Sequence, residues 1–358
     1  MRSRISLLHA IFKRKSMKTN PGPVMLDVVG KTLNDDDKRR LAHPMTGGVI
    51  LFARHYESRA QLIALTDSIR AIREDLLIAV DHEGGRVQRF RTDGFTVLPA
   101  MGKLGALWGS DVMHATKVTT AVGYILASEL RACGIDMSFT PVLDLNYGQS
   151  QVIGDRAFHS DPRVVAMLAK NLNHGLALAG MSNCGKHFPG HGFAHADSHV
   201  AMPVDERSLD EILRDDVAPY DWLGLSLGSV IPAHVVYPQV DSKPAGFSRI
   251  WLQDILRGKL RFEGAIFSDD LSMEAARQGG TLTEGATAAL QAGCDMVLIC
   301  NQPEKAEQVL DELRFTPSKE SQQRLKRMRP RDKALKWSKL VAEPRYLQAQ
   351  ALLRSVFA

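Results

Sequence analysis

Short apolar runs alternate with longer segments of helical periodicity along most of the chain. In Arg59–Arg73, for example, Leu62, Leu65 and Ile69 recur on one face of a predicted helix. Further helices are predicted at Val112–Arg131, Arg163–Ala179, Ser208–Trp222, Arg249–Leu260 and Thr283–Ala292. Eight runs have the length and composition of buried strands: Val24–Val29, Gly48–Phe52, Leu76–Val80, Ile135–Leu145, Asn183–Lys186, Ser229–Ala233, Gly264–Phe267 and Met296–Cys300.

Strands that alternate with helices usually form a parallel sheet, and eight such units over about 280 residues close a barrel. The alternative is an open, doubly wound sheet, which typically carries a glycine-rich phosphate turn after its first strand. The segment from Val28 to Thr32 is not such a turn. We therefore predict a single (β/α)₈ TIM-type barrel. We expect it to be irregular near the first strands, because the link Lys31–Ala42 is short and polar.

The first 17 residues differ from the rest in charge. They carry five Lys and Arg and no acid, so they account for the whole net charge of +5. Their apolar stretch is short and has no cleavage site, so we interpret residues 1–17 as a disordered basic extension or a start set too early, not a signal peptide. No linker interrupts residues 18–358, for which we predict one catalytic barrel domain with terminal helices at about 315–358.

The composition of the chain limits the kinds of molecule that we expect it to bind. The chain is 44% hydrophobic and 24% charged, which is typical of a globular protein. The basic run 319–345 contains one aromatic residue, Trp337, so a solvated helical face is favoured over a nucleic-acid patch. No apolar run approaches the roughly 18 residues of a membrane span. Four cysteines without CxxC spacing fit a reducing compartment, so we predict a cytoplasmic protein that binds neither nucleic acid nor membrane.

Polar residues follow six of the predicted strands. They are the run from Asp81 to Arg86, Asp144 with Asn146, Lys186 with His187, His234, Asp269 with Asp270, and Asn301. In a barrel the carboxyl ends of all strands meet on one face, where active sites are built. We therefore expect these side chains to surround one site.

The segment from Lys186 to Gly192, followed by Asp197 and His199, concentrates groups that transfer protons. His187, His191, His195 and His199 are spaced by four, which on a helix would suggest a metal site. Pro189 and two glycines argue against that helix, although ligation from a loop stays an alternative. The other interpretation pairs Asp197 with His199, because a carboxylate raises the pKa of a neighbouring imidazole and steadies its charged form. Such a pair can act as general acid and then general base.

Two further groups indicate the ligand. Of the adjacent acids Asp269 and Asp270, we expect one to cap the following helix and the other to face the barrel mouth. Positive side chains near the mouth would bind phosphate or a polyhydroxylated ligand: Arg89, Arg156 and Lys186. A phosphate site would favour glycine-rich turns after the seventh and eighth strands, and none is suitably placed, so a sugar is preferred.

Four motifs, in this order, resemble glycoside hydrolase family 3, and within it the bacterial cytoplasmic β-N-acetylhexosaminidases of the NagZ type. The motifs are Asp81 to Arg89, Val152 to Phe158, Lys186 to Gly192 with Asp197 to His199, and Ile266 to Met273. The resemblance covers about 22–310 and implies a (β/α)₈ barrel. It departs from the usual pattern at Asp155 and Ala157, neither of which is a catalytic position.

The resemblance also implies residue roles. Asp269 matches the nucleophile, His199 the acid/base and Asp197 its partner. The positions expected to hold N-acetylglucosamine are Asp81, Arg89, Arg156, Lys186 and His187. No metal and no cofactor is expected.

The implied substrates are β-1,4-linked N-acetylglucosaminyl-anhydro-muramyl peptides of peptidoglycan recycling, cleaved by water with retention through a double displacement. We expect a monomer. A phosphorylase of the same family stays open, because a neutral imidazole does not repel an incoming phosphate. A metal-dependent hydrolase and a noncatalytic sugar-binding barrel are the remaining alternatives.

Overall fold

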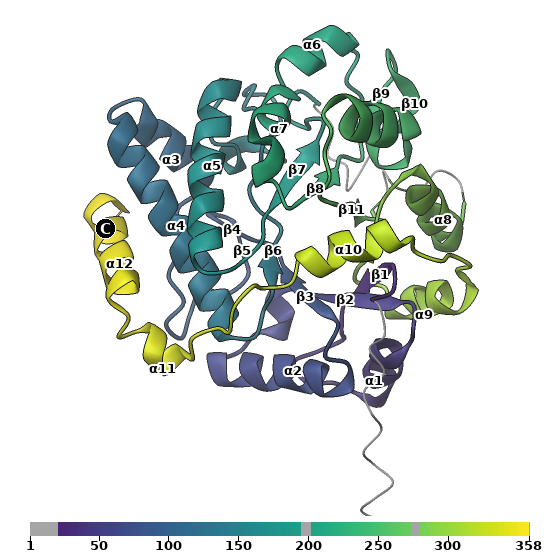
Figure 1. Cartoon of the computed structure of the whole chain (residues 1–358), viewed down its shortest axis with the longest axis horizontal. Helices are drawn as coiled ribbons and strands as arrows, with labels where there is room; N and C mark the ends of the chain where they lie inside the picture. The colour runs from purple at the N-terminus through teal and green to yellow at the C-terminus, as the bar shows by residue number, and fades with distance from the viewer. Residues whose placement is uncertain (1–20, 195–201, 274–275, 277–279, 358) are drawn as a thin grey trace, which may run out of the picture.

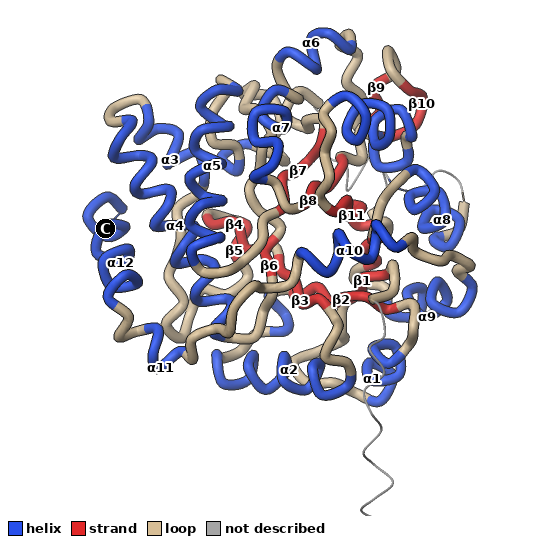
Figure 2. Tube along the Cα trace, viewed as in Figure 1, coloured by secondary structure: helices blue, strands red, loops and turns tan. Residues whose placement is uncertain are grey.

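Eight parallel strands form a central ring in the computed structural model, which describes residues 21–194, 202–273, 276 and 280–357. The strands are β1 (Val24–Leu26), β2 (Thr46–Leu51), β3 (Leu77–Val80), β6 (Met137–Ser138), β7 (Cys184–Phe188), β8 (Ser229–Pro232), β11 (Ala265–Asp270) and β12 (Met296–Ile299). Their order in the sheet is β6-β3-β2-β1-β12-β11-β8-β7. The two outer strands meet through parallel bridges from Met137 to Ser182 and from Val142 to Lys186. The ring therefore closes, which confirms the (β/α)₈ barrel and excludes the open sheet (Figure 2).

The barrel is irregular in two places. Near the first strands, the register between β1 and β2 shifts between Val24 and Met25. The predicted strand Ile135–Leu145 was too long, because β6 ends at Ser138. Pro141 lies beyond it and has no N–H to donate to the ladder. The chain still pairs with β7 beyond Ser138: the carbonyl of Thr140 accepts the N–H of Cys184, and Leu143 donates its N–H to the carbonyl of Lys186, both at 2.7 Å.

Helices connect successive strands on the outside of the ring (Figure 1). They are α1 (Asp35–Ala42), α2 (Arg59–Ile72), α4 (Val112–Ala132), α5 (Pro162–Leu178), α6 (Leu209–Arg214), α7 (Ala218–Leu223), a π-type helix (Ile250–Lys259), α8 (Leu282–Ala292) and α9 (Pro303–Glu312). The predicted helix Ser208–Trp222 is in fact two helices. Pro219 lies in the first turn of the second helix, where its missing N–H costs no hydrogen bond, so α7 begins there.

Additional elements lie between the barrel strands. After β3 come a hairpin of β4 (His82–Gly84) and β5 (Val87–Gln88), and then α3 (Met101–Trp108). After β8 comes a second hairpin of β9 (Val236–Tyr237) and β10 (Asp241–Pro244). Short 3₁₀ turns occur at Ala53–His55, Gly154–Arg156, Gly224–Ser226 and Ala245–Phe247. Both hairpins follow the carboxyl end of a barrel strand, so they build the mouth.

The described part of the chain ends in three helices outside the strand ring, namely α10 (Lys319–Arg327), α11 (Trp337–Leu340) and α12 (Pro344–Phe357). The ring interior is filled by apolar side chains such as Met25, Phe139 and Phe267. Leu325 and Met328 belong to the same cluster, so α10 closes the end of the barrel where the strands begin. Both α11 and α12 pack against α4.

Candidate active site

A network of buried charges lies at the carboxyl ends of β3 and β7. The Nζ atom of Lys186 is 2.8 Å from Oδ1 of Asp81 and 2.7 Å from Oε1 of Glu83. Arg156 donates to both carboxylate oxygens of Glu83, at 2.8 and 3.0 Å. Arg89 lies 3.4 Å from the other oxygen of Asp81. The structure thus brings together four of the five residues expected to hold a sugar.

Lys186 and Glu83 stay ionised because their charged neighbours stabilise them. Burial alone would lower the pKa of Lys186, but Asp81 and Glu83 raise it above its ordinary value. Burial would likewise raise the pKa of Glu83, but Arg156 and Lys186 bring it far below its usual range. Ionised donors and acceptors make the stronger, shorter hydrogen bonds of proteins. The group can therefore bind hydroxyls through both donors and acceptors.

Asp144 fixes the fifth expected sugar ligand, His187. Its Oδ2 atom is 2.7 Å from Nδ1 of His187, and its Oδ1 accepts the backbone N–H groups of His187 and His191 at 3.2 and 2.7 Å. Burial raises the pKa of Asp144, but the two histidines and these hydrogen bonds lower it overall. An ionised carboxylate accepts the Nδ1 proton, which leaves Nε2 of His187 as the free ring nitrogen.

The adjacent acids Asp269 and Asp270 end β11, and neither caps the next described helix, α8, which begins at Leu282 with Thr281 as its N-cap. Asp270 accepts the backbone N–H and the hydroxyl of Ser272 and the backbone N–H of Cys300, at 2.9, 2.7 and 3.1 Å. It therefore holds two loops together. The Oδ1 atom of Asp269 accepts the backbone N–H of Asp270 at 2.8 Å.

Asp269 is held in the anionic form by its surroundings. Burial acts to raise its pKa, but His234, His187, the N–H of Asp270 and Lys186 lower it below the ordinary value. His234 lies stacked on Phe247, with ring centroids 5.6 Å apart. Burial lowers the pKa of His234 itself, with Asp269 opposing the shift. An ionised carboxylate among cationic and imidazole groups, at a barrel mouth, has the properties of a nucleophile or an electrostatic stabiliser.

Comparison with known proteins accounts for this arrangement. The sequence pattern of the glycosyl hydrolase family 3 N-terminal domain matches residues 23–329. The chain belongs to glycosyl hydrolase family 3. This family 3 hydrolase is 59% identical over 347 residues to a protein of Bordetella avium named β-hexosaminidase, covering 96% of this chain and 99% of that one. The resemblance noted in the motifs is confirmed.

Solved structures agree with this assignment. NagZ from Neisseria gonorrhoeae in complex with N-trifluoroacetyl-D-glucosamine superposes on the family 3 hydrolase with a TM-score of 0.89 at 47% identity, covering 94% of this chain and 98% of that one. A second structure of NagZ from the same organism, in complex with a zinc ion, gives a TM-score of 0.88 at 45% identity, with coverage of 95% and 99%. The match therefore spans nearly the full length of both solved chains.

The expected acid/base residue His199 and its partner Asp197 lie outside the described residues. The described chain stops at the buried Ala194 and resumes at Met202. Just after that point, Asp205 donates its N–H to the carbonyl of Val236 in β9 at 2.9 Å. Both ends of the interval therefore lie on the mouth side of the barrel, after β7 and beside β9.

Two residues of this candidate site had no assigned role in the sequence, Glu83 and Asp144. Glu83 lies two positions after Asp81, and β4 is a strand, so both can face the same side. His82, between them, packs instead against Phe90 and Phe95. The alternating directions of Asp81, His82 and Glu83 could therefore have indicated from the sequence that Glu83 lies on the same side as Asp81. Asp144 was expected near the site because it falls at the end of a strand-like run, but its role gave no local signal, because its partners come from residues 43 and 47 positions away.

The described residues were also searched for a metal centre and a membrane helix. Within 21–194, 202–273, 276 and 280–357, no three His, Cys, Asp or Glu side chains are grouped so that they could hold a metal ion. His195 and His199, which belong to the histidine row, lie outside these ranges. Of the helices in this part of the family 3 hydrolase, none is long and apolar enough to span a bilayer.

Proposed function

We propose that this family 3 β-hexosaminidase is a retaining β-N-acetylhexosaminidase. It releases terminal N-acetylglucosamine from β-1,4-linked anhydro-muramyl peptides during peptidoglycan recycling. The observation that carries the proposal is the ionised carboxylate of Asp269 beside the buried network of Lys186 and Glu83. The glucosamine derivative bound to NagZ from Neisseria gonorrhoeae supports the choice of sugar.

The charged network would hold the nonreducing sugar. Asp81 and Arg89 are partly exposed, whereas Lys186 and Glu83 are buried behind them. Arg156 and Lys186 provide fixed donors, Asp81 provides an acceptor, and His187 presents its Nε2 atom. Rigidly placed groups position a substrate without reorganising, which contributes to the rate as well as to binding.

Asp269 would attack the anomeric carbon. Its Oδ1 atom is held by the N–H of Asp270, and its charge is maintained by Lys186 and the imidazoles of His187 and His234. The bond from carbon to the departing oxygen breaks as the carboxylate forms a glycosyl–enzyme ester. Two displacements at one carbon give net retention.

His199, partnered by Asp197, would move the proton. In the first step protonated His199 gives its proton to the departing oxygen. In the second step neutral His199 takes a proton from the water that attacks the ester. General acid–base catalysis of this kind contributes about 10²–10⁴-fold.

The setting proposed for the enzyme is the cytoplasm, where it would act as a monomer and bind neither nucleic acid nor membrane. All four cysteines are free and buried, which fits a reducing compartment. No metal or organic cofactor takes part in the proposed steps.

The test compares an aryl β-N-acetylglucosaminide with the matching aryl β-glucoside, with and without phosphate and with a chelator. We expect hydrolysis of the first substrate at least 100-fold faster, with the β-anomer of N-acetylglucosamine formed first in NMR spectra. An α-anomer would contradict retention. A sugar phosphate would identify a phosphorylase, and loss of activity in chelator would identify a metal-dependent hydrolase.

A further inference from the structure

Arg207 is a mostly buried cation near the barrel mouth that the proposed steps do not use. Its side chain is 11% exposed. It binds both carboxylate oxygens of Asp205 at 3.0 and 2.6 Å, and its Nη1 atom lies 2.8 Å from Oδ2 of Asp216. The hydroxyl of Tyr147 accepts from the same Nη1 and donates to Asp216, both at 2.9 Å. These contacts fix the plane of the guanidinium group.

The same guanidinium covers an aromatic ring that precedes the interval 195–201. Its central carbon is 4.1 Å from the ring centroid of Phe193 and 5.0 Å from that of Tyr147, and the two rings meet edge to face. Such cation–π contacts are stronger where water is excluded. The carbonyl of Phe193 also accepts the side-chain N–H of Gln149 at 2.9 Å. The chain is therefore held as far as Phe193.

The chain is also held where it resumes after the interval. Val236 of β9 donates its N–H to the carbonyl of Pro203 at 3.0 Å, and Asp205 donates its N–H to the carbonyl of Val236 at 2.9 Å. Asp205 is fully buried, and its Oδ1 accepts the backbone N–H of Arg207 at 3.1 Å. Arg207 thus contacts Phe193 before the interval and Asp205 after it.

Asp216 connects these contacts to the loop that leaves β7. A Cβ atom added to Gly190 would lie 2.5 Å from Oδ1 of Asp216, so the loop backbone packs directly on this acid. The carbonyl of Gly190 accepts the hydroxyl of Tyr237 at 2.7 Å. The loop from β7, the ring of Phe193 and the chain at Asp205 are therefore all held around one arginine and its acids.

We propose that Arg207 is a positioning residue for proton transfer in the hydrolysis. It would act through Phe193 and Asp205, which it holds on either side of the interval that contains Asp197 and His199. The inference rests on the acid/base role proposed above for His199, and it gives Arg207 no contact with the sugar. A misplacement of about 1 Å can cost about 10²-fold in rate. Loss of the contacts of Arg207 should therefore impair proton donation while the donor itself is still present.

The test compares kcat/KM for two substrates, because this quantity reports only the steps up to the first displacement. A dinitrophenyl β-N-acetylglucosaminide releases its leaving group without a proton, whereas a methylphenyl β-N-acetylglucosaminide requires one. Arg207→Lys keeps the charge but not the planar fork. We expect it to lower kcat/KM at least tenfold for the methylphenyl glycoside and less than threefold for the dinitrophenyl glycoside. A role in stability alone would lower both values by the same factor.

Phe193→Leu is a milder variant for the same test. It leaves both acids of Arg207 paired and removes only the aromatic ring, so it decides the question if Arg207→Lys does not fold. We expect the same selective loss for the methylphenyl glycoside, of at least threefold.

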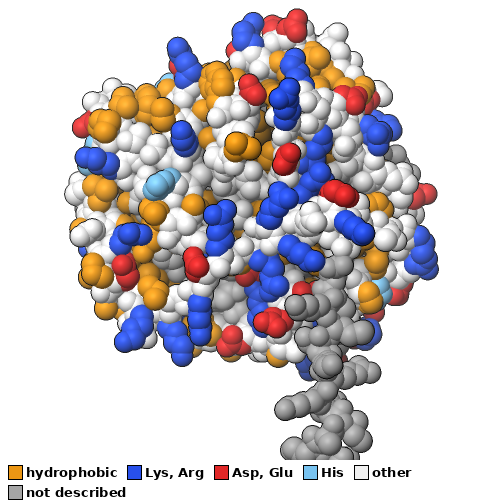
Figure 3. Space-filling model, viewed as in Figure 1, with side chains coloured by type: hydrophobic (Ala, Val, Ile, Leu, Met, Phe, Trp, Pro, Cys, Tyr) orange, Lys and Arg blue, Asp and Glu red, His pale blue; other side chains and the backbone are white. Residues whose placement is uncertain are grey.

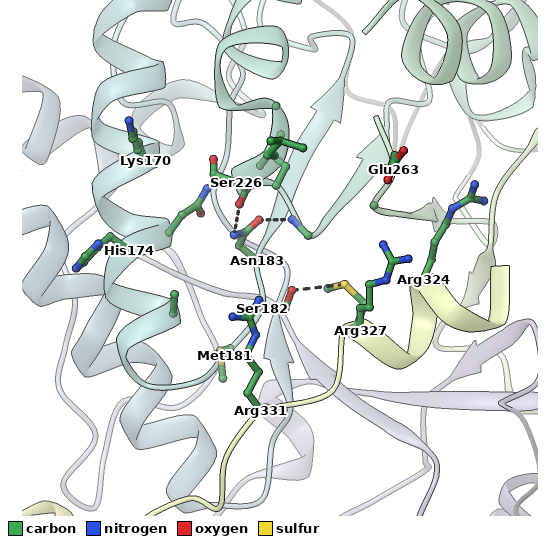
Figure 4. Close-up of a pocket in the computed structure, with 18 of the residues that line it drawn as sticks. Lys170, His174, Met181, Ser182, Asn183, Ser226, Glu263, Arg324, Arg327 and Arg331 are labelled. Atoms are coloured by element: carbon green, nitrogen blue, oxygen red, sulfur yellow. Dashed lines mark hydrogen bonds between the residues drawn. The ribbon is translucent and has the colours of Figure 1, made fainter. Parts of the chain in front are cut away.

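The matched control is Arg324→Gln in α10. Arg324 also pairs with a buried acid, Asp295, at 3.3 Å, but it lines a pocket at the opposite end of the barrel, where β7 begins (Figure 4). Lys and Arg side chains gather on that face (Figure 3). The control should change kcat/KM for neither substrate.

His199→Ala is the reference variant and should show the largest selective loss. If it lowered kcat/KM equally for both substrates, the acid/base role of His199 would be wrong and the inference would fall with it. If His199→Ala showed the selective loss and neither Arg207→Lys nor Phe193→Leu did, the positioning role of Arg207 alone would be overturned.

Discussion

Replacing Glu83 by Gln should lower the free energy of unfolding far more than the same replacement does in an exposed ion pair. Glu83 is 2% exposed and is contacted by Lys186 at 2.7 Å and by Arg156 at 2.8 and 3.0 Å. Gln keeps the shape of the side chain and removes its charge. Lys186 then keeps Asp81 as its carboxylate partner at 2.8 Å, whereas Arg156 loses the carboxylate that it contacts.

The size of the effect follows from burial. Removing one partner of a buried ion pair costs about 3–5 kcal/mol, because the other charge stays buried without compensation. The control is Glu57→Gln, which removes an ion pair with Lys31 at 2.8 Å, where both side chains are about half exposed or more. Water screens that pair, so no measurable loss of stability is expected.

Urea unfolding and steady-state kinetics are the assays. Glu83→Gln should lower the free energy of unfolding by about 3–5 kcal/mol. It should also raise KM for an aryl β-N-acetylglucosaminide at least tenfold, since Lys186 and Arg156 lose their anchor. If Glu83→Gln and Glu57→Gln gave equal unfolding midpoints, or if KM were unchanged, the view of Glu83 as the support of the sugar site would be wrong.

Two further predictions concern other buried carboxyl groups. Asp144→Asn should lower kcat/KM about 10²-fold, because an amide binds the Nδ1 proton of His187 and the N–H of His191 less strongly than a carboxylate does. If kcat/KM and its pH profile were both unchanged, this role of Asp144 would be refuted. Burial raises the pKa of Glu129, which is hydrogen-bonded to Tyr346 of α12, to about 7 from 4.5. The folded state thus binds the proton more tightly, so this stabilisation is full below pH 4.5 and is lost as pH rises through 7, by roughly 3 kcal/mol. In Glu129→Gln the midpoint of urea unfolding should no longer show this dependence on pH. If the midpoints of the variant and the unaltered protein changed with pH in parallel, the role given to Glu129 would be wrong.

The strand count and the convergence of polar residues were predictable because they depend on local patterns. Runs such as Leu76–Val80 and Met296–Cys300 are apolar on both faces, as strands buried between a barrel interior and a helix layer must be. The polar residue after each run then falls at the mouth. Asp269 was recognisable for this reason. The role of Asp270 was not, because one of the two acids was expected to cap a helix, whereas Asp270 bonds Ser272 and Cys300.

Features that depend on long-range contacts were not predictable in the same way. The end of β6 at Ser138 reflects the pairing of residues 140–143 with β7. The role of Asp144 depends on backbone N–H groups of a loop that follows another strand. The basic run 319–345 is solvated over most of its length, as predicted, since residues such as Lys319, Lys326 and Lys333 are exposed. Nothing local shows, however, that α10 lies across the bottom of the barrel.

Covalent trapping tests the central claim most directly. The unaltered protein, incubated with a 5-fluoro derivative of N-acetylglucosaminyl fluoride and digested, should yield one peptide carrying the sugar on Asp269. Asp269→Ala should form no adduct and should lose nearly all turnover. A sugar attached to Asp270 or to any other side chain, or turnover that persists in Asp269→Ala, would contradict the account.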